Sequence, residues 1–436
     1  MVATDAPPLN IAVLGAGTVG SQVIRILGEQ ADEFAARSGA YLNVSGVLVR
    51  NVDAPRDAEF DRALLTTDAD AVIAGADIVI ELIGGIEPAR TLVLQALNAG
   101  KSVVTGNKAL LATHGPELFK AAAEAGVDLY YEAAVAGAIP VVYGLRESLA
   151  GDRITKVLGI VNGTTNFILD AMTTTGASYE EALAEAQALG YAEADPSADV
   201  DGLDAAAKCA ILASLAFHTR VGIDDVAVEG ITGITSQDID EAEFMGQKIK
   251  LLAIAERRAD EDGRQGVSVR VHPALVPNSH PLSTVDGAFN AVVVEGEAAG
   301  RLMFYGQGAG GAPTASAVLS DLVAAASHRV HGGSGPRESA YAKLPILDPG
   351  AAWTRYQMRL HVVDRVGVLA EVASVFARHG VSIHSVHQRE GVADGEATIV
   401  IATHGAREAD LRAVAAALAH TDAVRDVAST IRMEGE

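Results

Sequence analysis

The stretch from Gly190 to Lys208 holds the side chains best suited to chemistry. Asp204 and Lys208 lie four residues apart, so on a helix they share one face. Glu193 and Asp199 precede them in a segment typical of a loop. The predicted helix beyond Lys208 is otherwise apolar. This lysine is therefore either the solvated edge of a core helix or a partly desolvated amine suited to proton transfer.

A second candidate site is a glycine-rich turn near the start of the chain. It follows an apolar segment at residues 9–14 and precedes a segment with helical spacing at residues 21–37. In that context glycines permit a tight turn, a close approach of a pyrophosphate to the backbone, and close packing of helix on strand. The turn therefore predicts dinucleotide binding, with a turn that only packs as the alternative. Its residues are Gly15, Ala16, Gly17, Thr18, Val19 and Gly20.

The next predicted strand, residues 44–49, ends in Arg50 rather than in an acidic residue. The carboxylate of an Asp or Glu there would accept hydrogen bonds from the ribose hydroxyls of NAD, whereas a guanidinium can pair with the 2′-phosphate of NADP. NADP(H) is therefore favoured, and Asp53 nearby keeps NAD(H) open. An ordinary solvated arginine is the alternative for Arg50.

The elements that must position these residues follow an alternating pattern through the first 150 residues. Apolar segments at 71–73, 78–82, 102–105 and 127–131 predict strands, and 90–99 and 116–125 predict helices. Such alternation is typical of the α/β class, with a doubly wound, Rossmann-like parallel sheet. We expect this domain to span residues 1–150 and to be completed by residues 308–343, which include a helix at 313–325.

The pattern changes after residue 150. Strand-like segments at 156–161, 266–271 and 290–296 mix with helix-like segments at 179–189, 203–218 and 244–257. This predicts an α+β substrate-binding and dimerisation domain with an open mixed sheet over residues 151–307. A linker at 344–352 then leads to residues 353–436, whose order βαββαβ predicts a ferredoxin-like domain.

The composition narrows the class of function. The 436 residues carry 33 basic and 56 acidic side chains, a net charge of −23, so nucleic acid and anionic membranes would be repelled. Eight of the carboxylates lie between residues 179 and 204, where no basic residue occurs. The one cysteine, Cys209, excludes an intramolecular disulfide, and no segment resembles a secretion signal or a membrane span. We therefore expect a cytoplasmic protein.

Five motifs make the chain resemble homoserine dehydrogenases, at residues 105–108 (Thr-Gly-Asn-Lys), 161–168 (Val-Asn-Gly-Thr-Thr-Asn-Phe-Ile), 190–208, 280–290 and 305–314. The resemblance covers residues 8–330 and is to the monofunctional form, because no aspartokinase segment is seen before the glycine-rich turn. It implies reversible interconversion of L-homoserine and L-aspartate 4-semialdehyde, in threonine, methionine and isoleucine biosynthesis. A nicotinamide nucleotide would carry the hydride.

The resemblance also implies roles for individual residues. Lys208 and Lys108 would be the catalytic lysines, together with Asp204, and which lysine transfers the proton stays open. Lys108 would lie between the nicotinamide and the substrate. Glu193, Asp199, Asp204 and Lys108 would form the substrate pocket, although Ala198 stands where some relatives have a further aspartate. Gly308 would touch the cofactor, with a helix-capping turn as the alternative.

A cation site and an oligomeric state are implied by resemblance alone. Glu132, Val135, Gly137 and Ile139 match a site for Na⁺ or K⁺ near the domain hinge, where backbone carbonyls would supply most ligands. A structural role for this cation is expected over a catalytic one. A homodimer or homotetramer is expected, and sequence does not choose between them.

The C-terminal segment resembles an ACT domain, because residues 356–376 lead from a strand through Asp364 into a helix. The free N–H groups at Gly367 and Leu369 could receive an amino-acid carboxylate. In this family such a domain implies feedback inhibition by L-threonine, and a dimerisation module without ligand is the alternative. Two other functions are weighed for the whole chain: a non-catalytic amino-acid sensor, and a different nicotinamide enzyme such as a 2-hydroxy-acid dehydrogenase.

Overall fold

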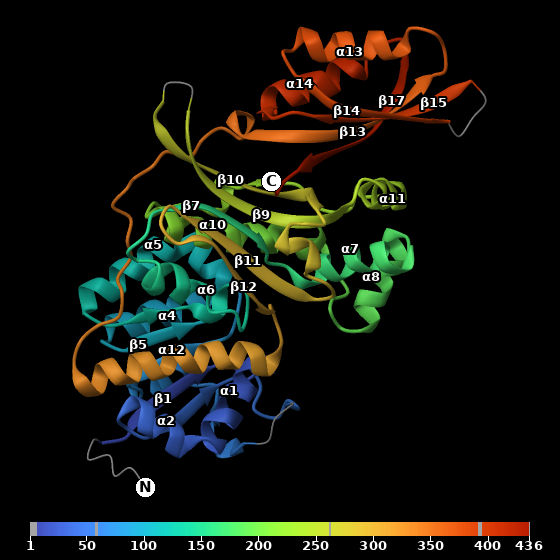
Figure 1. The fold of residues 1–436 in the computed structure, drawn as a ribbon. Coiled ribbons are helices and arrows are strands. Elements are labelled where there is room, and N and C mark those ends of the chain that lie inside the picture. The colour runs from blue at the N-terminus through green and yellow to red at the C-terminus, as the bar shows by residue number, and fades with distance from the viewer. Residues whose placement is uncertain (1–6, 57–59, 261–262, 391–394, 436) are drawn as a thin grey trace.

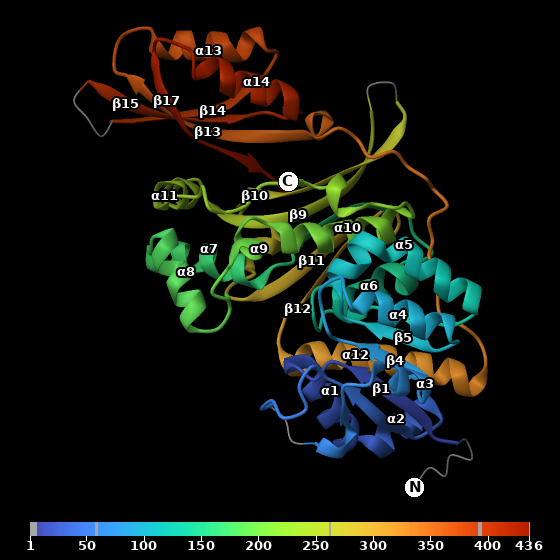
Figure 2. The same ribbon diagram turned by 180° about the vertical axis from the view of Figure 1, so that it is seen from behind.

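The computed structural model describes residues 7–56, 60–260, 263–390 and 395–435, which form three stacked parts (Figures 1 and 2). At the end near the N-terminus lies a six-stranded sheet in the order β3-β2-β1-β4-β5-β6, with parallel pairing throughout. Its strands are β1 (Leu9–Leu14), β2 (Leu42–Leu48), β3 (Leu65–Thr66), β4 (Ile78–Glu81), β5 (Ser102–Thr105) and β6 (Leu129–Tyr130). The predicted doubly wound sheet is confirmed.

Helices cover both faces of this parallel sheet, as buried strands require. One face packs on α1 (Thr18–Glu29), α2 (Ala31–Ser38) and α12 (Gly311–His331), and the other on α3 (Ala69–Ala74), α4 (Ala89–Asn98) and α5 (Lys108–Ala125). Helix α12 comes from far along the chain, yet it runs beside α1 (Figure 1). A late segment of the chain, α12, therefore packs on the nucleotide sheet.

Two local predictions in this part are wrong. Residues 71–73, expected as a strand, lie in α3, because the Asp68 side chain caps the helix by accepting a hydrogen bond from the Ala71 N–H. In α3 only Val72 and Ile73 are buried. Three consecutive apolar residues at 71–73 are too few to distinguish the helical period from that of a buried strand. The single helix expected over residues 21–37 is divided at Gln30 into α1 and α2.

The middle part is built on an open mixed sheet. Its strands are β7 (Ile154–Ile160), β9 (Gln247–Ala259), β10 (Gln265–Pro277), β11 (Phe289–Gly296) and β12 (Gly300–Gln307), with a two-residue β8 (Ala227–Val228) beside β10. The helices are α7 (Gly163–Thr175), α8 (Tyr179–Ala188), α9 (Ser197–Val200), α10 (Leu203–Phe217) and α11 (Ser236–Phe244). A short α6 (Val141–Tyr143) lies between the two parts of the chain.

The long helix expected over residues 244–257 is wrong. Helix α11 ends at Phe244, Gly246 has a left-handed φ of +68°, and the chain then forms β9. This strand pairs with β7 on one side and β10 on the other and is buried along most of its length. A strand buried on both faces loses the alternation of apolar and polar residues, so its sequence cannot be told from that of a buried helix.

The C-terminal part adds four strands to the same sheet. They are β13 (Trp353–Val363), β14 (Ile383–Glu390), β15 (Glu396–Thr403) and β17 (Val424–Met433), with α13 (Val368–Arg378) and α14 (Glu408–Leu418) on one face and a two-residue β16 (Ala406–Arg407). The predicted order βαββαβ is confirmed. In the middle of the combined sheet, β17 pairs in parallel with β10 through Ala274–Arg432 and Leu275–Met433.

The segment expected as a linker is also attached to this sheet. Ile346 forms an isolated bridge to Val267 of β10, and the Val267 N–H donates to the Pro345 carbonyl at 2.9 Å. A buried ion pair joins Arg270 to Glu434 at 2.8 Å across the same junction. The C-terminal part is thus tied to the substrate part by backbone pairing and by charge. Among the described residues, no helix is both long and apolar enough to cross a membrane.

Candidate active site

The glycine-rich turn after β1 has the geometry of a phosphate cradle. Gly15 adopts a φ of +105°, and a Cβ there would lie 2.8 Å from the Leu82 carbonyl oxygen. A Cβ at Gly20 would lie 2.0 Å from the Gly15 oxygen, so α1 packs too closely for any side chain. At Gly17, in contrast, a Cβ would meet nothing within 4 Å. Gly17 is also the N-cap of α1 and supplies no side-chain acceptor, so the helix amides are free to bind an anion.

A second glycine-rich loop lies against this cradle. A Cβ at Gly311 would be 3.1 Å from the Thr18 oxygen, which places the start of α12 beside the start of α1. A Cβ at Gly137 would be 2.5 Å from the Gly308 oxygen. The backbone around Gly308 is therefore held between the nucleotide turn and the loop after β6. This placement fits a nicotinamide nucleotide whose phosphates lie at Gly17.

Arg50 follows β2 at the edge of the cradle. Its side chain is exposed and, within the part of the chain that the structure describes, makes no hydrogen bond or ion pair. Arg56 and Arg62 hold the following loop instead, and both donate to the Ala54 carbonyl. Asp53 is exposed in that loop. The guanidinium of Arg50 is thus unengaged where the 2′-position of a bound nucleotide is expected.

A cavity of 540 Å³ opens between the nucleotide and substrate parts. Its walls come from the starts of α5, α7, α10 and β11, from α9 and the segment that follows α8, and from the Gly308 loop. The lining residues are Lys108, Asn162, Gly163, Thr164, Leu189, Gly190, Tyr191, Asp199, Asp204, Lys208, Ala288, Phe289, Gln307, Gly308, Ala309 and Gly310.

One wall of the cavity, called the charged wall below, is formed by Asp204, Lys208, Lys108 and Asn162, and Asp204 lies at its centre. Its Oδ2 lies 2.7 Å from Lys208 Nζ and accepts a hydrogen bond from Asn162 Nδ2 at 2.8 Å, and its Oδ1 forms an ion pair with Lys108 Nζ. Lys208 also donates to the Val161 carbonyl at 2.6 Å. The predicted pair on α10 therefore exists, and the start of α5 adds the second lysine to it.

Burial and charge act on these groups in opposite directions. Burial alone would raise the pKa of Asp204, but the charges of Lys208 and Lys108 outweigh burial and hold that pKa well below its ordinary value. Burial lowers the pKa of Lys208 below its ordinary value, and Asp204 opposes this. An ammonium group whose proton is loosened in this way is suited to giving it to a developing alkoxide and taking it back.

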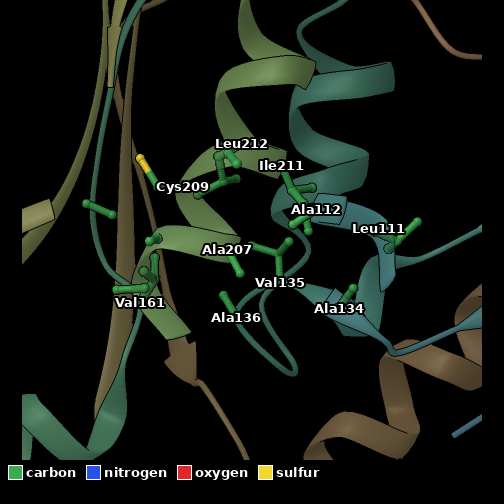
Figure 3. Close-up of a cluster of buried hydrophobic side chains, with 14 of the residues drawn as sticks. Leu111, Ala112, Ala134, Val135, Ala136, Val161, Ala207, Cys209, Ile211 and Leu212 are labelled. Carbon is green, nitrogen blue, oxygen red and sulfur yellow. The ribbon is translucent and has the colours of Figure 1, made fainter. Parts of the chain in front are cut away.

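The exposure of the two lysines differs. The side chain of Lys208 is 10% exposed, whereas that of Lys108 is 43% exposed. Around Lys208 the helix α10 is packed in an apolar cluster, in which Ala207 lies beside Val135 and Ala136, and Ile211 lies beside Ala112 of α5 (Figure 3). Lys208 is thus held in the buried part of the charged wall, while Lys108 faces the open side of the cavity.

Asn162 is a site residue to which sequence reasoning assigned no role. It caps α7, its Oδ1 accepts from the Thr165 N–H at 2.8 Å, and its Nδ2 joins Asp199 and Asp204 at 2.6 and 2.8 Å. One side-chain amide thus holds two of the predicted carboxylates together. An Asn before a helical segment is a signal for a cap, and that signal was present at residues 162–166.

Glu193 lies away from the other predicted substrate residues. It is exposed in the segment between α8 and α9 and does not line the cavity. Its own carbonyl accepts from Gln187 Nε2 at 3.0 Å, and the nearby Tyr191 carbonyl accepts from Thr164 Oγ1 at 2.6 Å. The segment is anchored near the cavity, but the Glu193 carboxylate is not part of the charged wall in this structure.

The residues predicted to bind a cation form a buried loop. Both carboxylate oxygens of Glu132 accept backbone hydrogen bonds, from Val142 at 2.9 Å and Tyr143 at 2.7 Å. Burial raises the pKa of Glu132 to about 7, although those bonds oppose the shift. Ala136 and Gly137 both have left-handed φ values of 58°. Over the described residues, no cluster of three or more His, Cys, Asp or Glu could hold a metal ion.

The predicted effector residues lie at the start of α13, in the domain farthest from the nucleotide sheet (Figure 2). Gly367 is the N-cap of that helix with a φ of +93° and offers no side-chain acceptor. Asp364 and Leu369 are exposed on either side of it. The start of α13 is therefore exposed at the position where the sequence predicts an effector site.

Comparison with known families gives matches along the whole chain. The family model for homoserine dehydrogenase matches residues 140–323, the model for its NAD binding domain matches 15–132, and that for the ACT domain matches 356–419. Homoserine dehydrogenase of Corynebacterium glutamicum is 55% identical, with 100% of both chains covered. The protein of that name from Mycobacterium tuberculosis is 57% identical over 99% of both chains.

Solved structures agree with these matches. A homoserine dehydrogenase from Thiobacillus denitrificans superposes with a TM-score of 0.91 at 41% identity, covering 98% of each chain. The homoserine dehydrogenase of S. aureus gives 0.76 at 32% identity, covering 99% of this chain and 100% of that chain. A hyperthermophilic archaeal homoserine dehydrogenase in complex with NADPH gives 0.62 at 27% identity, covering 76% of this chain and 99% of that chain.

Proposed function

The chain belongs to the homoserine dehydrogenase family, and on that premise we propose that its 540 Å³ cavity is where L-homoserine and L-aspartate 4-semialdehyde are interconverted. The protein is an NAD(P)-dependent oxidoreductase that acts on the CH–OH group of homoserine. This activity argues against a non-catalytic sensor and against a 2-hydroxy-acid dehydrogenase. The observation that carries the proposal is the buried Lys208–Asp204–Lys108 cluster at the junction of the two parts.

Each residue of the cluster has a proposed role. When bound, the nicotinamide supplies or receives the hydride. Lys208 gives a proton to the oxygen of the aldehyde as it is reduced, and the neutral amine takes it back in oxidation. Lys108, on the open side of the cavity, polarises the same oxygen. Asp204 keeps both ammonium groups charged and oriented.

The substrate's ammonium group calls for carboxylates. We assign it to Asp199 and Asp204, whose side chains Asn162 holds together, so that few acids carry the contact. Glu193 would join them only after its side chain turns toward the cavity, since Leu189, Gly190 and Tyr191 line the cavity but Glu193 does not.

NADP(H) is the proposed cofactor, with NAD(H) as a weaker one. The residues that would hold it are the turn from Gly15 to Gly20, Gly308 beside it, and Arg50. Support comes from the open space over Gly17 and from the exposed guanidinium of Arg50, which has no competing carboxylate partner in the described chain. The buried loop from Glu132 to Ile139 would take Na⁺ or K⁺ through its carbonyl groups, in a structural role.

The remaining proposals concern the setting of the enzyme. We assign the nucleotide domain to residues 1–150 with 308–343, the substrate domain to 151–307 and the ACT domain to 353–436. L-threonine would bind at the start of α13, near Asp364, Gly367 and Leu369, and inhibit the enzyme of threonine, methionine and isoleucine biosynthesis. A cytoplasmic homodimer or homotetramer is the expected form.

One experiment tests the proposed function. The purified protein is mixed with NADPH and aspartate semialdehyde, and the loss of NADPH absorbance is followed with and without millimolar L-threonine. The Lys208→Ala variant should keep its fold and its affinity for NADPH but lose turnover by several decades. Near wild-type turnover in that variant contradicts the role of Lys208, and threonine insensitivity contradicts the regulatory proposal.

A further inference from the structure

Helix α7 carries a line of polar side chains that runs away from the catalytic cavity. Asn162, Asn166 and Asp170 are spaced four residues apart, so they follow one another along one side of the helix. Asn162 binds the catalytic carboxylates, as described above. The other two bind residues 285–289, a loop that ends at the first residue of β11 and supplies Ala288 and Phe289 to the lining of the cavity.

Asn166 holds this loop with one amide group. Its Nδ2 lies 3.0 Å from the carbonyl oxygen of Val285, 2.8 Å from that of Gly287 and 3.4 Å from that of Phe289. The side chain is only 1% exposed. The bond to Val285 is buried and those to Gly287 and Phe289 are partly buried, so this one amide supplies hydrogen-bond donors to the carbonyls of the chain just before the β11–β12 pairing.

Lys250 of β9 completes the anchor. Its Nζ donates to the Val285 carbonyl at 2.7 Å and to Asn166 Oδ1 at 3.1 Å, and the residue is 1% exposed. Because an ammonium group has donors and no acceptor, it fixes the amide of Asn166 with its oxygen toward Lys250 and its nitrogen toward the loop. Asp170 adds one more bond, accepting from the Gly287 N–H at 2.8 Å.

The loop is also pressed against the start of α7. A Cβ at Gly163 would lie 2.7 Å from the Ala288 carbonyl oxygen, so there is no room for a side chain between them. On the cavity side Phe289 stacks on Tyr305 with ring centroids 5.2 Å apart. A shift of the anchor is therefore passed to the residues that face the substrate.

A buried lysine is costly, which makes its position informative. Burial lowers the pKa of Lys250 to about 8, and both of its hydrogen-bond acceptors are neutral. An apolar residue of similar length would avoid that desolvation, so packing alone does not explain a lysine here. What an apolar residue cannot do is orient Asn166 and hold the Val285 carbonyl.

We propose that Lys250 and Asn166 are positioning residues of the dehydrogenase: they fix the loop at residues 285–289 and thereby set how the cavity fits its substrate. This inference rests on the proposed use of the 540 Å³ cavity by homoserine and aspartate semialdehyde. Neither side chain lines that cavity, so both act through Ala288 and Phe289.

The test compares Lys250→Met with the wild type. We expect kcat/KM for aspartate semialdehyde to fall by about 10- to 100-fold, mainly through a higher KM, since a displacement of about 1 Å can cost a factor of that size. The Kd of NADPH should stay within twofold. The melting temperature is measured alongside, because the variant removes the cost of an interior charge but also removes a donor from the Val285 carbonyl and Asn166 Oδ1. Asn166→Asp, which keeps an acceptor for Lys250 but loses the donors to the loop, should show the same KM effect.

Lys248→Met is the matched control. Lys248 lies two residues earlier on the same strand and pairs with Asp286 of the same loop at 3.2 Å, but the pair is exposed to solvent. Its removal should change KM less than twofold. Asp170→Ala, which removes the bond to Gly287 and a negative charge near Lys250, gives a second measurement if Lys250→Met does not fold, and it should raise KM severalfold.

The proposal is overturned if Lys250→Met, or Asp170→Ala in its place, has wild-type KM and kcat in the folded fraction, or loses only thermal stability. The proposed function fails in a different way, through a wild-type protein that does not oxidise NADPH with aspartate semialdehyde. The two failures are therefore separable.

Discussion

Replacing Asp204 by asparagine removes the charge between two ammonium groups while keeping the shape of the side chain. Asp204 Oδ2 lies 2.7 Å from Lys208 Nζ, which corresponds to about 6 kcal/mol at an effective dielectric of about 20 and about 1.5 kcal/mol at about 80. These energies equal roughly four and one pKa units. Burial already lowers the pKa of Lys208, so loss of the carboxylate should lower it further.

The sign of the effect follows from the role of Lys208. Aldehyde reduction needs the protonated amine, so kcat falls as the pH rises through the pKa of Lys208. In Asp204→Asn this fall should therefore begin at a lower pH, by the roughly one to four units that the energies above correspond to. The reverse reaction, homoserine oxidation, needs the neutral amine, and its rising limb should move to lower pH by the same amount.

The assay is the pH dependence of kcat in both directions, followed by NADPH absorbance. Asp199→Asn is the control, because Asp199 also binds Asn162 but forms no ion pair with Lys208. It should raise the substrate KM and shift the pH profile of kcat in the same direction but by less than Asp204→Asn, because the charge of Asp199 acts on Lys208 more weakly than that of Asp204. If Asp204→Asn keeps the wild-type pH profile, Asp204 does not set the charge of Lys208 and the reasoning is wrong.

Three further predictions concern the cofactor site and folding. Gly17→Ala should fold normally, because its Cβ would meet nothing within 4 Å, yet raise the Kd of NADPH at least tenfold in a binding titration, whereas Gly20→Ala should lower the melting temperature sharply. Arg50→Ala should raise the Kd of NADPH about tenfold and leave the Kd of NADH unchanged. Equal effects on both dissociation constants would contradict the 2′-phosphate assignment. Burial, with Arg432 and Arg270 nearby, lowers the pKa of His272 to about 3, so below about pH 6.5 the unfolded chain gains a proton that the folded chain does not. The free energy of unfolding should therefore fall by about 2 kcal/mol between pH 6.5 and pH 5, and His272→Gln should remove that slope in denaturant titrations.

Much of the site was predictable because its signals are local. The turn from Gly15 to Gly20 sits between a strand and a helix, and Asp204 and Lys208 lie one helical turn apart, so both features follow from spacing alone. The C-terminal βαββαβ order was likewise visible in the alternation of short periodic segments.

The rest depends on contacts between distant segments. Strand β9 was mistaken for a helix because it is buried between β7 and β10, which hides its period. The pairing of β17 with β10 joins residues more than 150 positions apart, and no local sequence pattern predicts such a pairing. Lys250 was missed for the same reason, since its partners Asn166 and Val285 come from two other parts of the chain.

The most direct test of the account is a crystal structure of the protein with NADPH and L-homoserine, which cannot react with each other. We expect the homoserine hydroxyl within hydrogen-bonding distance of Lys208 or Lys108, its ammonium group on Asp199 or Asp204, and the NADPH phosphates over Gly17. Homoserine bound outside the 540 Å³ cavity, or with its hydroxyl away from both lysines, would contradict the central claim.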